Sequence, residues 1–506
     1  MIKTIDCDVT IIGAGHNGLV AAAYLAKAGK KVRVLEANGE IGGATTSVRA
    51  FPGFDARISR YSYLVSLLPD SIISELGLNF ECISRTVSSF TPYELSGVNQ
   101  GLFVSRHWDE ATENSFSLLD PSGDEGEAWQ KFYSEIAEFA QCIAPTLLKP
   151  LMTRSELKAL IAMPLVWDYM IEKPIGEVIT ERFKEDLVRG VVLTDALIGT
   201  FASAFEIQAN ICFLYHLMGN GTGEWKVPKG GMGALVSELE RVARDAGVLI
   251  EVNKRVVKVE SDFEGATVTT ADGEKIRSLY VLSNAAPQIL AQLSGRIAPK
   301  SLDGSQMKIN VLLKRLPKLK SGVDPRLAFA GTFHANESFS QFESAFEKAK
   351  KGLFPEMMPI EMYCHTLSDS SILSPELADL GYQTLTLFGL HTPAALFDAN
   401  NDGAREEALK SALASLNHYL AEPIESLIVG IEVKTPLDIE AEIGLPRGNI
   451  FHRDLHFPFR EDGTEPSWGV ETDDSRIFIC GAGAIRGGGV SGVPGHNAAM
   501  AILAKD

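Results

Sequence analysis

The chain has few cysteines, and none of them lies close to another. Six of its 506 residues are cysteine, at positions 7, 82, 142, 212, 364 and 480. No pair has C-x-x-C or C-x₄-C spacing, which argues against a disulfide framework and a redox-active cysteine pair and favours a reducing compartment. We expect Cys7 and Cys480 to be small buried apolar side chains on core strands.

Long apolar runs are also missing. The stretch at 159–167 is interrupted by Pro164 and is far shorter than the ~20 residues that span a bilayer. Residues 147–171 are apolar with scattered charges, so peripheral membrane contact stays open, although a pair of substrate-domain helices is the favoured interpretation. The first expected strand begins close to Met1, which predicts no cleavable targeting segment and a cytoplasmic protein.

Basic residues are in the minority. The formal net charge is −18, and the acidic residues are spread along the chain. Nucleic acid and broadly anionic membranes attract clustered Lys and Arg, so neither is an expected partner.

A glycine-rich turn follows the first apolar run. Residues 9–18 read VTIIGAGHNG, which gives Gly13, Gly15 and Gly18 the G-x-G-x-x-G spacing between a strand and a helix expected at 19–28. Gly13 allows the turn, Gly15 lets a pyrophosphate approach the backbone, and Gly18 lets the helix pack closely on the strand. The turn therefore predicts a dinucleotide-binding unit.

Two later features refine that prediction. A strand expected at 31–35 ends at Glu36, where an acid binds adenosine ribose hydroxyls and repels the 2′-phosphate of NADP. Gly42 and Gly43 follow, and residues 477–497 read IFICGAGAIRGGGVSGVPGHN. A flavin needs backbone amides at its ring system as well as at its phosphates, so two glycine-rich segments favour FAD over NAD.

The rest of the chain indicates interleaved domains. A helix expected at 234–246 and strands expected at 248–252, 256–260, 266–270 and 279–283 return to the nucleotide-binding pattern in mid-chain. We predict an α/β fold with a Rossmann-like FAD-binding domain at 1–85, 225–300 and 431–506. A mixed α+β substrate domain is expected at 86–224 and 301–430, where strands with alternating residue patterns cover a substrate cavity.

Several stretches resemble a known family. They are GAGHNGLVAAAYLAKAGKKVRVLEA at 13–37, PGFDARISRYSYLVSLLPDSI at 52–72, PKGGMGALVSELERVARDAG at 228–247, TPLDIEAEIGLPRGNIFHRDL at 435–455 and the glycine run at 481–495. The chain resembles the phytoene-desaturase-like flavoprotein amine-oxidoreductase superfamily, and within it the pyridine nucleotide-disulfide oxidoreductase domain-containing protein 2 group. The resemblance implies the amine-oxidase or phytoene-desaturase type of fold, with FAD as cofactor.

The resemblance also implies roles for particular residues. The ADP half of FAD would be bound by Gly13, Gly15, Gly18 and Glu36, with the adenine against the backbone of Val256. The ribityl and flavin would lie along Gly42, Gly43 and Ala44. In the closing segment the cofactor would contact Gly481, Ala482, Gly489, Val490 and Ser491, ahead of a helix starting near His496. Departures from the group, such as Ala44 and Tyr215-His216, leave the substrate open.

The expected chemistry depends on the flavin, since no Ser-His-Asp set or metal cluster is evident. His452 is the candidate proton-transfer residue because a histidine titrates in the required range, with a structural histidine as the alternative. Arg60, Tyr61 and Trp225 are candidate substrate contacts. No metal site is expected. His452 and His456 could form a metal-binding pair on a helix, but their segment is predicted to be loop or strand.

The favoured function is an FAD-dependent oxidoreductase that takes a hydride from a C–H bond of a largely apolar substrate, in the manner of a desaturase. An amine oxidase, a flavin-dependent isomerase and a non-catalytic escort protein of the GDP-dissociation-inhibitor kind are the alternatives. Oxygen or a quinone would be the electron acceptor, and a homo-oligomer is possible.

Overall fold

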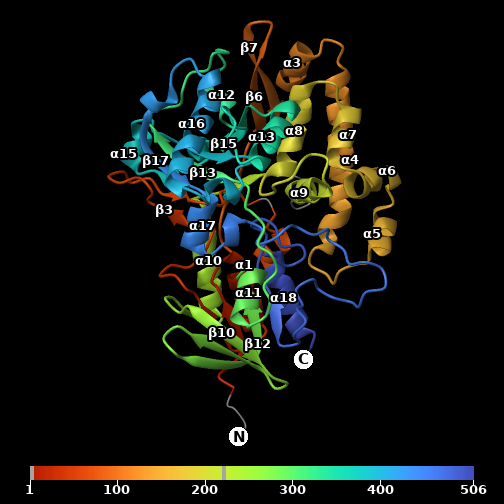
Figure 1. Cartoon of the computed structure of the whole chain (residues 1–506), viewed down its shortest axis with the longest axis vertical. Coiled ribbons are helices and arrows are strands. Elements are labelled where there is room, and N and C mark those ends of the chain that lie inside the picture. Colours follow the sequence, from red (N-terminus) through yellow and green to blue (C-terminus); the bar gives the residue numbers. More distant parts are fainter. Residues whose placement is uncertain (1–4, 66, 219–220, 222–223, 506) are drawn as a thin grey trace.

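The computed structural model describes residues 5–65, 67–218, 221 and 224–505. Two mixed sheets form its two ends, with a bundle of helices beside the upper sheet (Figure 1). The first few residues of the expected first domain segment lie outside the described residues.

The lower sheet is a Rossmann-type sheet. Its parallel strands run in the order β9-β2-β1-β12-β18, and β10 and β11 extend it through an antiparallel meander that pairs with the first half of β12. The bounds are β1 (Cys7–Ile12), β2 (Val32–Leu35), β9 (Leu249–Glu251), β10 (Val256–Ser261), β11 (Ala266–Thr270), β12 (Lys275–Ser283) and β18 (Ile477–Ile479). Strands from three distant parts of the chain therefore build one sheet, as the sequence predicts.

Among the described residues, the helices of this lower unit include α1 (His16–Lys27), α2 (Asp70–Leu76), α10 (Met232–Asp245), α11 (Pro287–Leu293) and α18 (Val493–Leu503). Helix α1 packs against both α10 and α18 and is buried along nine consecutive residues, 17–25, because its alanines and glycine allow close approach. Cys7 and Cys480 are buried in the same apolar core, which confirms the expectation for both.

The upper sheet has seven strands in the order β17-β13-β16-β15-β14-β6-β7. Its strands are β6 (Val87–Leu95), β7 (Val98–Ser105), β13 (Met307–Leu313), β14 (Thr332–Ala335), β15 (Ile360–Tyr363), β16 (Gln383–Gly389) and β17 (Ile428–Lys434). One face packs on α16 (Asn401–Tyr419) through an apolar core that includes Ile309, Leu385 and Met362. The other face carries the polar residues of the same strands and is described below.

The helices between β7 and β8 pack around a second hydrophobic core. They are α3 (Glu110–Leu119), α4 (Asp124–Ile143), α5 (Arg154–Ile161), α6 (Pro164–Trp167), α7 (Ile175–Arg182), α8 (Asp186–Leu197) and α9 (Ile207–Met218). Trp129, Phe132, Ile136 and Phe139 lie in their shared core, as their helical spacing predicts. No described helix has the length and apolar character needed to cross a membrane.

Short elements join the two ends. The ribbon of β3 (Ser47–Val48) and β4 (Ile58–Ser59) and the ribbon of β5 (Cys82–Ser84) and β8 (Lys226–Pro228) lie between the sheets. Helix α13 (Phe339–Lys350) packs against α8 of the helical core. The chain also forms the short helices α14 (His365–Ser368), α15 (Pro375–Asp379) and α17 (Pro436–Ile443). The expected boundary at 430/431 needs correction, because it would cut β17, which pairs with β13 in the upper sheet. We propose the same domain division with that boundary moved to 434/435.

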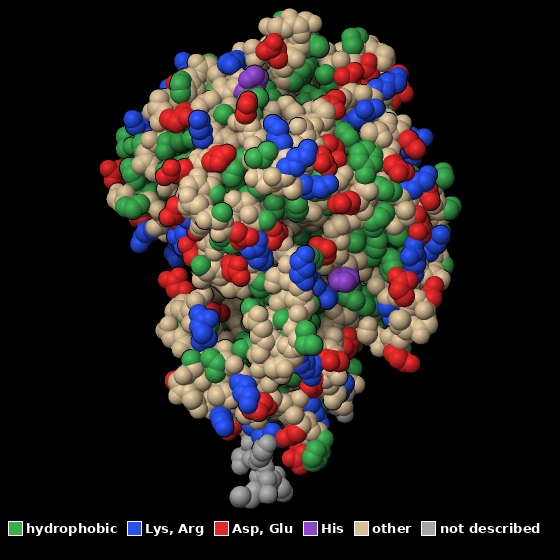
Figure 2. Space-filling view, viewed as in Figure 1, with side chains coloured by type: hydrophobic (Ala, Val, Ile, Leu, Met, Phe, Trp, Pro, Cys, Tyr) green, Lys and Arg blue, Asp and Glu red, His purple; other side chains and the backbone are tan. Residues whose placement is uncertain are grey.

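Acidic and basic side chains alternate over the visible surface without a large patch of either sign (Figure 2). Salt bridges such as those of Arg241 with Glu238 and Asp245 account for part of this mixture. The surplus of acid therefore makes no concentrated electrostatic feature on this face.

Candidate functional site

The glycine turn between β1 and α1 is tightly built. A Cβ on Gly18 would overlap the carbonyl oxygen of Gly13, and a Cβ on Gly15 would lie 2.7 Å from the side-chain amide of Asn284. Gly13 has φ +93°, a conformation that favours glycine. Backbone conformation thus favours glycine at Gly13, and space requires it at Gly18, whereas at Gly15 the Asn284 side chain alone would have to move.

The start of α1 offers free amides to an anion. Within α1 the first turn contains no acidic residue, and its N-cap Gly15 supplies no capping side chain. The first amides of a helix lack intrahelical partners, and the helix dipole makes this end positive. The geometry is that of a phosphate-binding helix terminus.

Glu36 lies at the end of β2, beside that turn. Its carboxylate accepts hydrogen bonds of 2.9 Å from the amides of Ala14 and Asn38 and is 8% exposed. The amide of Lys254 donates to the Glu36 carbonyl (2.7 Å), and Val256 begins β10 two residues later. The structure therefore brings Gly13, Glu36 and Val256 to one edge of the lower sheet.

The closing segment of the chain meets the opening segment. Strand β12 pairs in parallel with both β1 and β18, and a Cβ on Gly495 in α18 would overlap the Asn17 carbonyl of α1. The His16 ring lies against the backbone of Gly489 and donates to or accepts from the Thr45 hydroxyl (3.0 Å). Both glycine-rich segments consequently border the same region.

The other predicted cofactor residues lie around this junction. Gly42 pairs with Gly15 through a parallel bridge and Gly43 packs on the Gly15 backbone. Gly481 packs against the backbone of Asn284, and the Ser491 hydroxyl accepts a 3.2 Å hydrogen bond from Val493 at the start of α18. That helix begins three residues before the expected position near His496, because Gly492 takes the left-handed conformation and Pro494 fits the first helical turn.

Ala482 and Val490 are both buried at 9% exposure. Val490 belongs to the apolar core of the lower unit, whereas Ala44 lies in a small apolar cluster with Tyr61 and Ile439. The backbone of these residues, more than their side chains, can therefore contact a ligand.

Arg60 and Tyr61 have protein partners in the structure. Arg60 forms a 2.7 Å ion pair with Glu432, and the Tyr61 hydroxyl donates to Glu442. The carboxylate of Glu442 and burial raise the pKa of Tyr61 well above its usual range. Both side chains link the loop after β4 to the segment around β17 and α17.

Trp225 stacks on the ring of His216 at a centroid distance of 5.5 Å. It packs against a buried aromatic cluster that contains Tyr63, Tyr363 and Phe388. Of the predicted substrate contacts it lies nearest in sequence to β8, whose Val227 lines a pocket.

His452 lies beside the closing glycine run, next to Gly483. Its φ is +67°, its Nδ1 is buried, and no described residue bonds to that nitrogen. Burial, with the nearby His16, lowers the pKa of His452 to about 4, so its imidazole is neutral at neutral pH. The unsatisfied nitrogen is therefore a hydrogen-bonding group and a weak base.

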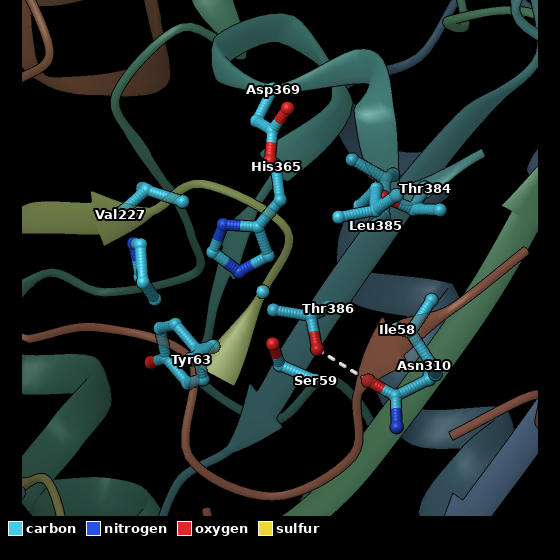
Figure 3. Close-up of a pocket in the computed structure, with 13 residues that line it drawn as sticks. Ile58, Ser59, Tyr63, Val227, Asn310, His365, Asp369, Thr384, Leu385 and Thr386 are labelled. Carbon is cyan, nitrogen blue, oxygen red and sulfur yellow. Dashed lines mark hydrogen bonds between the residues drawn. The ribbon is translucent and has the colours of Figure 1, made fainter. Parts of the chain in front are cut away.

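A small pocket lies where the upper sheet faces the β3–β4 and β5–β8 ribbons (Figure 3). Ile58, Val227 and Ile372 give it apolar walls. His365 projects into it between Val227 and Thr386 in the view of Figure 3. Among described residues, neither His365 Nε2 nor Thr384 Oγ1 has a hydrogen-bond partner. The lining also includes Ser59, Asn310, Asp369 and Thr386, so the pocket has both polar and apolar walls.

Beside this pocket the upper sheet buries a row of polar residues. Cross-strand neighbours place Lys308 next to Phe388, Phe388 next to Glu361, and Glu361 next to His334. Glu361 is 1% exposed and accepts hydrogen bonds from Tyr63 (2.9 Å) and Tyr363 (3.2 Å). Burial raises the pKa of Glu361 to about 7.

Sequence reasoning missed this row. The signal was present in the alternation of MKINVLL at 307–313 and IEMY at 360–363, where Lys308, Asn310, Glu361 and Tyr363 occupy every second position. A strand with one apolar and one polar face usually exposes the polar face to water. Only the tertiary structure reveals that this polar face is covered.

A second small pocket adjoins the closing glycine run. Tyr215, Gly488 and Ser491 line it with Leu67 and Arg486. Arg486 is 2% exposed and donates to the carbonyls of Thr146, Lys149 and Trp468. Arg486 therefore links the closing glycine run to the segment after α4 and to the loop that contains Trp468.

The described residues contain no group of three or more His, Cys, Asp or Glu side chains arranged to hold a metal ion. His452 and His456 lie in a segment without helix or strand. All six cysteines are free.

Known proteins match this chain along its whole length. Residues 11–71 match the NAD(P)-binding Rossmann-like domain, and residues 167–311 match the flavin containing amine oxidoreductases. An uncharacterised protein of Mycobacterium tuberculosis is 42% identical over 99% of this chain and 97% of its own. The pyridine nucleotide-disulfide oxidoreductase domain-containing protein 2 of Mus musculus is 31% identical over 98% of this chain and 93% of its own.

More distant matches agree on the fold. Carotenoid 3,4-desaturase of Haloarcula japonica is 25% identical over 55% of this chain and 55% of its own. The solved structure of a putrescine oxidase bound to putrescine superposes with a TM-score of 0.59 at 18% identity, covering 98% of this chain and 99% of that one. This structural likeness shows the amine-oxidase type of fold.

The residues described above suit the cofactor of these proteins. A helix terminus without acid fits a pyrophosphate, a carboxylate at the end of β2 fits a ribose, and glycines without room for Cβ let a ligand reach the backbone. The chain thus belongs to the family of pyridine nucleotide-disulfide oxidoreductase domain-containing protein 2. It is a flavin-containing oxidoreductase of the amine-oxidase type, and its cofactor is FAD.

Proposed function

We propose that this protein is an FAD-dependent oxidoreductase that removes a hydride from a C–H bond of a largely apolar organic substrate, in the manner of a desaturase or dehydrogenase. The observation that carries the proposal is the junction of the two glycine-rich segments beside a covered sheet face with an adjoining pocket. When bound, FAD supplies the hydride acceptor, N5 of its ring system.

The proposed cofactor contacts lie along the junction of the two glycine-rich segments. The first amides of α1 bind the pyrophosphate, the Glu36 carboxylate binds the ribose, and the backbone of Val256 borders the adenine. The remaining contacts are backbone groups of Gly42, Gly43, Ala44, Gly481, Ala482, Gly489, Val490 and Ser491. These residues position the cofactor and exclude water from it.

We propose the apolar walls around Ile58, Val227 and Ile372 as part of the substrate site. Similarity to a carotenoid desaturase supports an apolar substrate. Arg60, Tyr61 and Trp225 would shape the surroundings of that site through their partners Glu432, Glu442 and His216. His452, neutral at neutral pH, would hold or transiently accept a proton at Nδ1.

An amine oxidase is the second candidate function. The match of residues 167–311 to the flavin containing amine oxidoreductases favours it. The substrate would then be an amine, the imine product would be hydrolysed by water, and oxygen would be reduced to hydrogen peroxide.

One experiment separates these reactions. Holoenzyme is mixed without oxygen with lipid, isoprenoid and amine fractions, flavin bleaching is followed, and the product of each active compound is identified by mass. A desaturase yields a product lighter by two hydrogen atoms, since a hydride and a proton leave adjacent carbons. Ammonia with an aldehyde would identify an amine oxidase. Conversion of a compound to a product of unchanged mass by the pre-reduced holoenzyme, with no net change in flavin absorbance, would identify an isomerase. Either result would overturn the proposal. Failure of every fraction to bleach bound flavin would also count against it.

A further inference from the structure

Arg486, in the closing glycine run, is a buried cation without an acidic partner. It is 2% exposed, and Nη1 and Nη2 donate to the carbonyl oxygens of Thr146, Lys149 and Trp468. Within the described part of the chain no carboxylate forms an ion pair with Arg486, and its buried Nε has no hydrogen-bond partner. Carbonyl oxygens satisfy the donors of a guanidinium but carry no full negative charge to balance it.

The titratable groups around Arg486 do not neutralise its charge. Burial raises the pKa of Tyr215 above its usual range, so this phenol is uncharged at neutral pH, and Arg453 acts on the same tyrosine as a second cation. Burial also lowers the pKa of His496, which is therefore neutral. Glu471 is the acid that acts on Arg486, but it is exposed and its carboxylate accepts two backbone hydrogen bonds. Burial lowers the pKa of Arg486 only to about 10, so the guanidinium stays charged at neutral pH.

Arg486 lies beside the segment that we propose contacts the flavin. It lines one small pocket together with Gly488 and Ser491. Val493, the first residue of α18, lines the same pocket, and α18 has neither an acidic residue in its first turn nor a capping side chain. The Arg486 guanidinium and the positive end of α18 therefore act on the same stretch of backbone.

The proposed reaction brings negative charge to the cofactor. A hydride carries two electrons and one proton, so its transfer to the uncharged oxidised flavin adds one negative charge. A buried positive charge stabilises such an anion over several ångströms without direct contact, because solvent and salt screen it weakly. It also opposes the uptake of a second proton, which would remove the negative charge.

We propose that Arg486 provides the electrostatic stabilisation that keeps the reduced flavin anionic and favours it over the oxidised form. This inference rests on the proposed function and adds a residue that tunes the cofactor. The alternative role of Arg486 is purely structural, as a link between the closing glycine run and the neighbouring segments.

The first test is the reduction potential of the wild-type holoenzyme between about pH 5.5 and 6.5, where an anion is more easily protonated than at neutral pH. One pH unit is a tenfold change in proton activity, which shifts a two-electron couple by about 30 mV for each proton taken up. We expect about 30 mV per pH unit, the value for one proton. A slope of about 60 mV per pH unit would show that a second proton binds and would overturn the proposal.

Two variants separate the charge of Arg486 from its hydrogen bonds. Arg486→Gln removes the charge but keeps an amide donor. It should lower the reduction potential by about 30 mV or more, which corresponds to about a tenfold loss of preference for the reduced flavin. Arg486→Lys keeps the charge and has three donors, so the potential should shift by less than half as much. A wild-type potential in Arg486→Gln would contradict the proposal and leave Arg486 with a structural role.

Arg277→Gln is the matched control. Arg277 is also buried in the lower unit, but it pairs with Asp262 and lies at the end of β12 remote from the closing glycine run. Its replacement should leave the reduction potential at the wild-type value. Melting temperatures report the folding of each variant, and if Arg486→Gln does not fold, the wild-type slope decides.

Flavin content separates this inference from the proposed function. A protein that binds no flavin would overturn both. Bound flavin that is reduced by substrate, with a slope of about 60 mV per pH unit, would leave the proposed function standing and overturn the role of Arg486 alone.

Discussion

At the scale of single residues, the covered polar face of the upper sheet holds several groups with strongly displaced pKa values. Glu361 illustrates this, because its carboxyl group lies among tyrosines and next to His334 on the neighbouring strand. Burial raises its pKa from 4.5 to about 7. Lys308 is displaced in the opposite sense, since burial disfavours any charged form.

The displaced pKa of Glu361 predicts a pH dependence of stability. The folded pKa exceeds the unfolded value, so the folded state binds more protons between about pH 4.5 and 7, and the stabilising contribution is lost as pH rises through that window. Glu361→Gln cannot ionise, and its melting temperature should fall less than that of the wild type between about pH 5 and pH 8.

Scanning calorimetry across that pH range measures the effect. Glu347→Gln serves as a control because Glu347 is an exposed surface carboxylate with a lysine partner. Parallel curves for wild type and Glu361→Gln would mean that Glu361 titrates normally.

At the scale of elements, the turn from β1 into α1 depends on glycine more than on any side chain. Gly18→Ala would force the new Cβ against the Gly13 carbonyl and separate α1 from β1. We expect a loss of about 1–3 kcal/mol in the free energy of unfolding, as for other overpacked sites, and a large loss of FAD content. Melting temperature and flavin content of the purified variant measure both effects.

Gly39→Ala is the matched control in the same unit. Its Cβ would meet Asn253 at 3.5 Å, which is ordinary contact, and Gly39 is exposed. Both quantities should stay at wild-type values. Equal behaviour of the two variants would refute the requirement for close packing at Gly18.

Elements of the lower unit could be predicted from the sequence because local rules and tertiary context agree there. The glycine spacing, the apolar strands and Glu36 all point to one known arrangement, and strand β11 (Ala266–Thr270) has the predicted bounds. The predicted and observed elements differ mainly at their ends. Helix α1 begins at His16, three residues before the predicted start, since helix boundaries depend on backbone geometry at Gly15. The misplaced boundary within β17 has a different origin, because only pairing with β13 assigns that strand to the upper sheet.

The polar face could not be predicted in the same way. Lys308, Glu361 and His365 are distant in sequence, and each looks like an ordinary surface residue in its own segment. Their proximity arises from the strand order β13-β16-β15, which no local signal specifies. The predicted substrate residues Arg60 and Tyr61 lie near this region but are bound to Glu432 and Glu442.

At the scale of the whole molecule, the chain crosses repeatedly between its two ends. The lower sheet takes strands from residues 7–35, 249–283 and 477–479, and the upper sheet takes strands from 87–105 and 307–434. Figure 1 shows the two sheets at opposite ends with the connecting ribbons between them. The pocket lined by Ile58, Val227 and His365 lies at this connection, so motion of either end relative to the other would change its shape.

The central claim is that the opening and closing glycine-rich segments meet to hold FAD. The absorption spectrum of the purified protein, recorded before and after denaturation to quantify released flavin, tests it most directly. We predict a protein-bound flavin spectrum and about one equivalent of FAD per chain, as expected for one dinucleotide-binding unit. A colourless protein that stays free of flavin after incubation with added FAD would contradict the account.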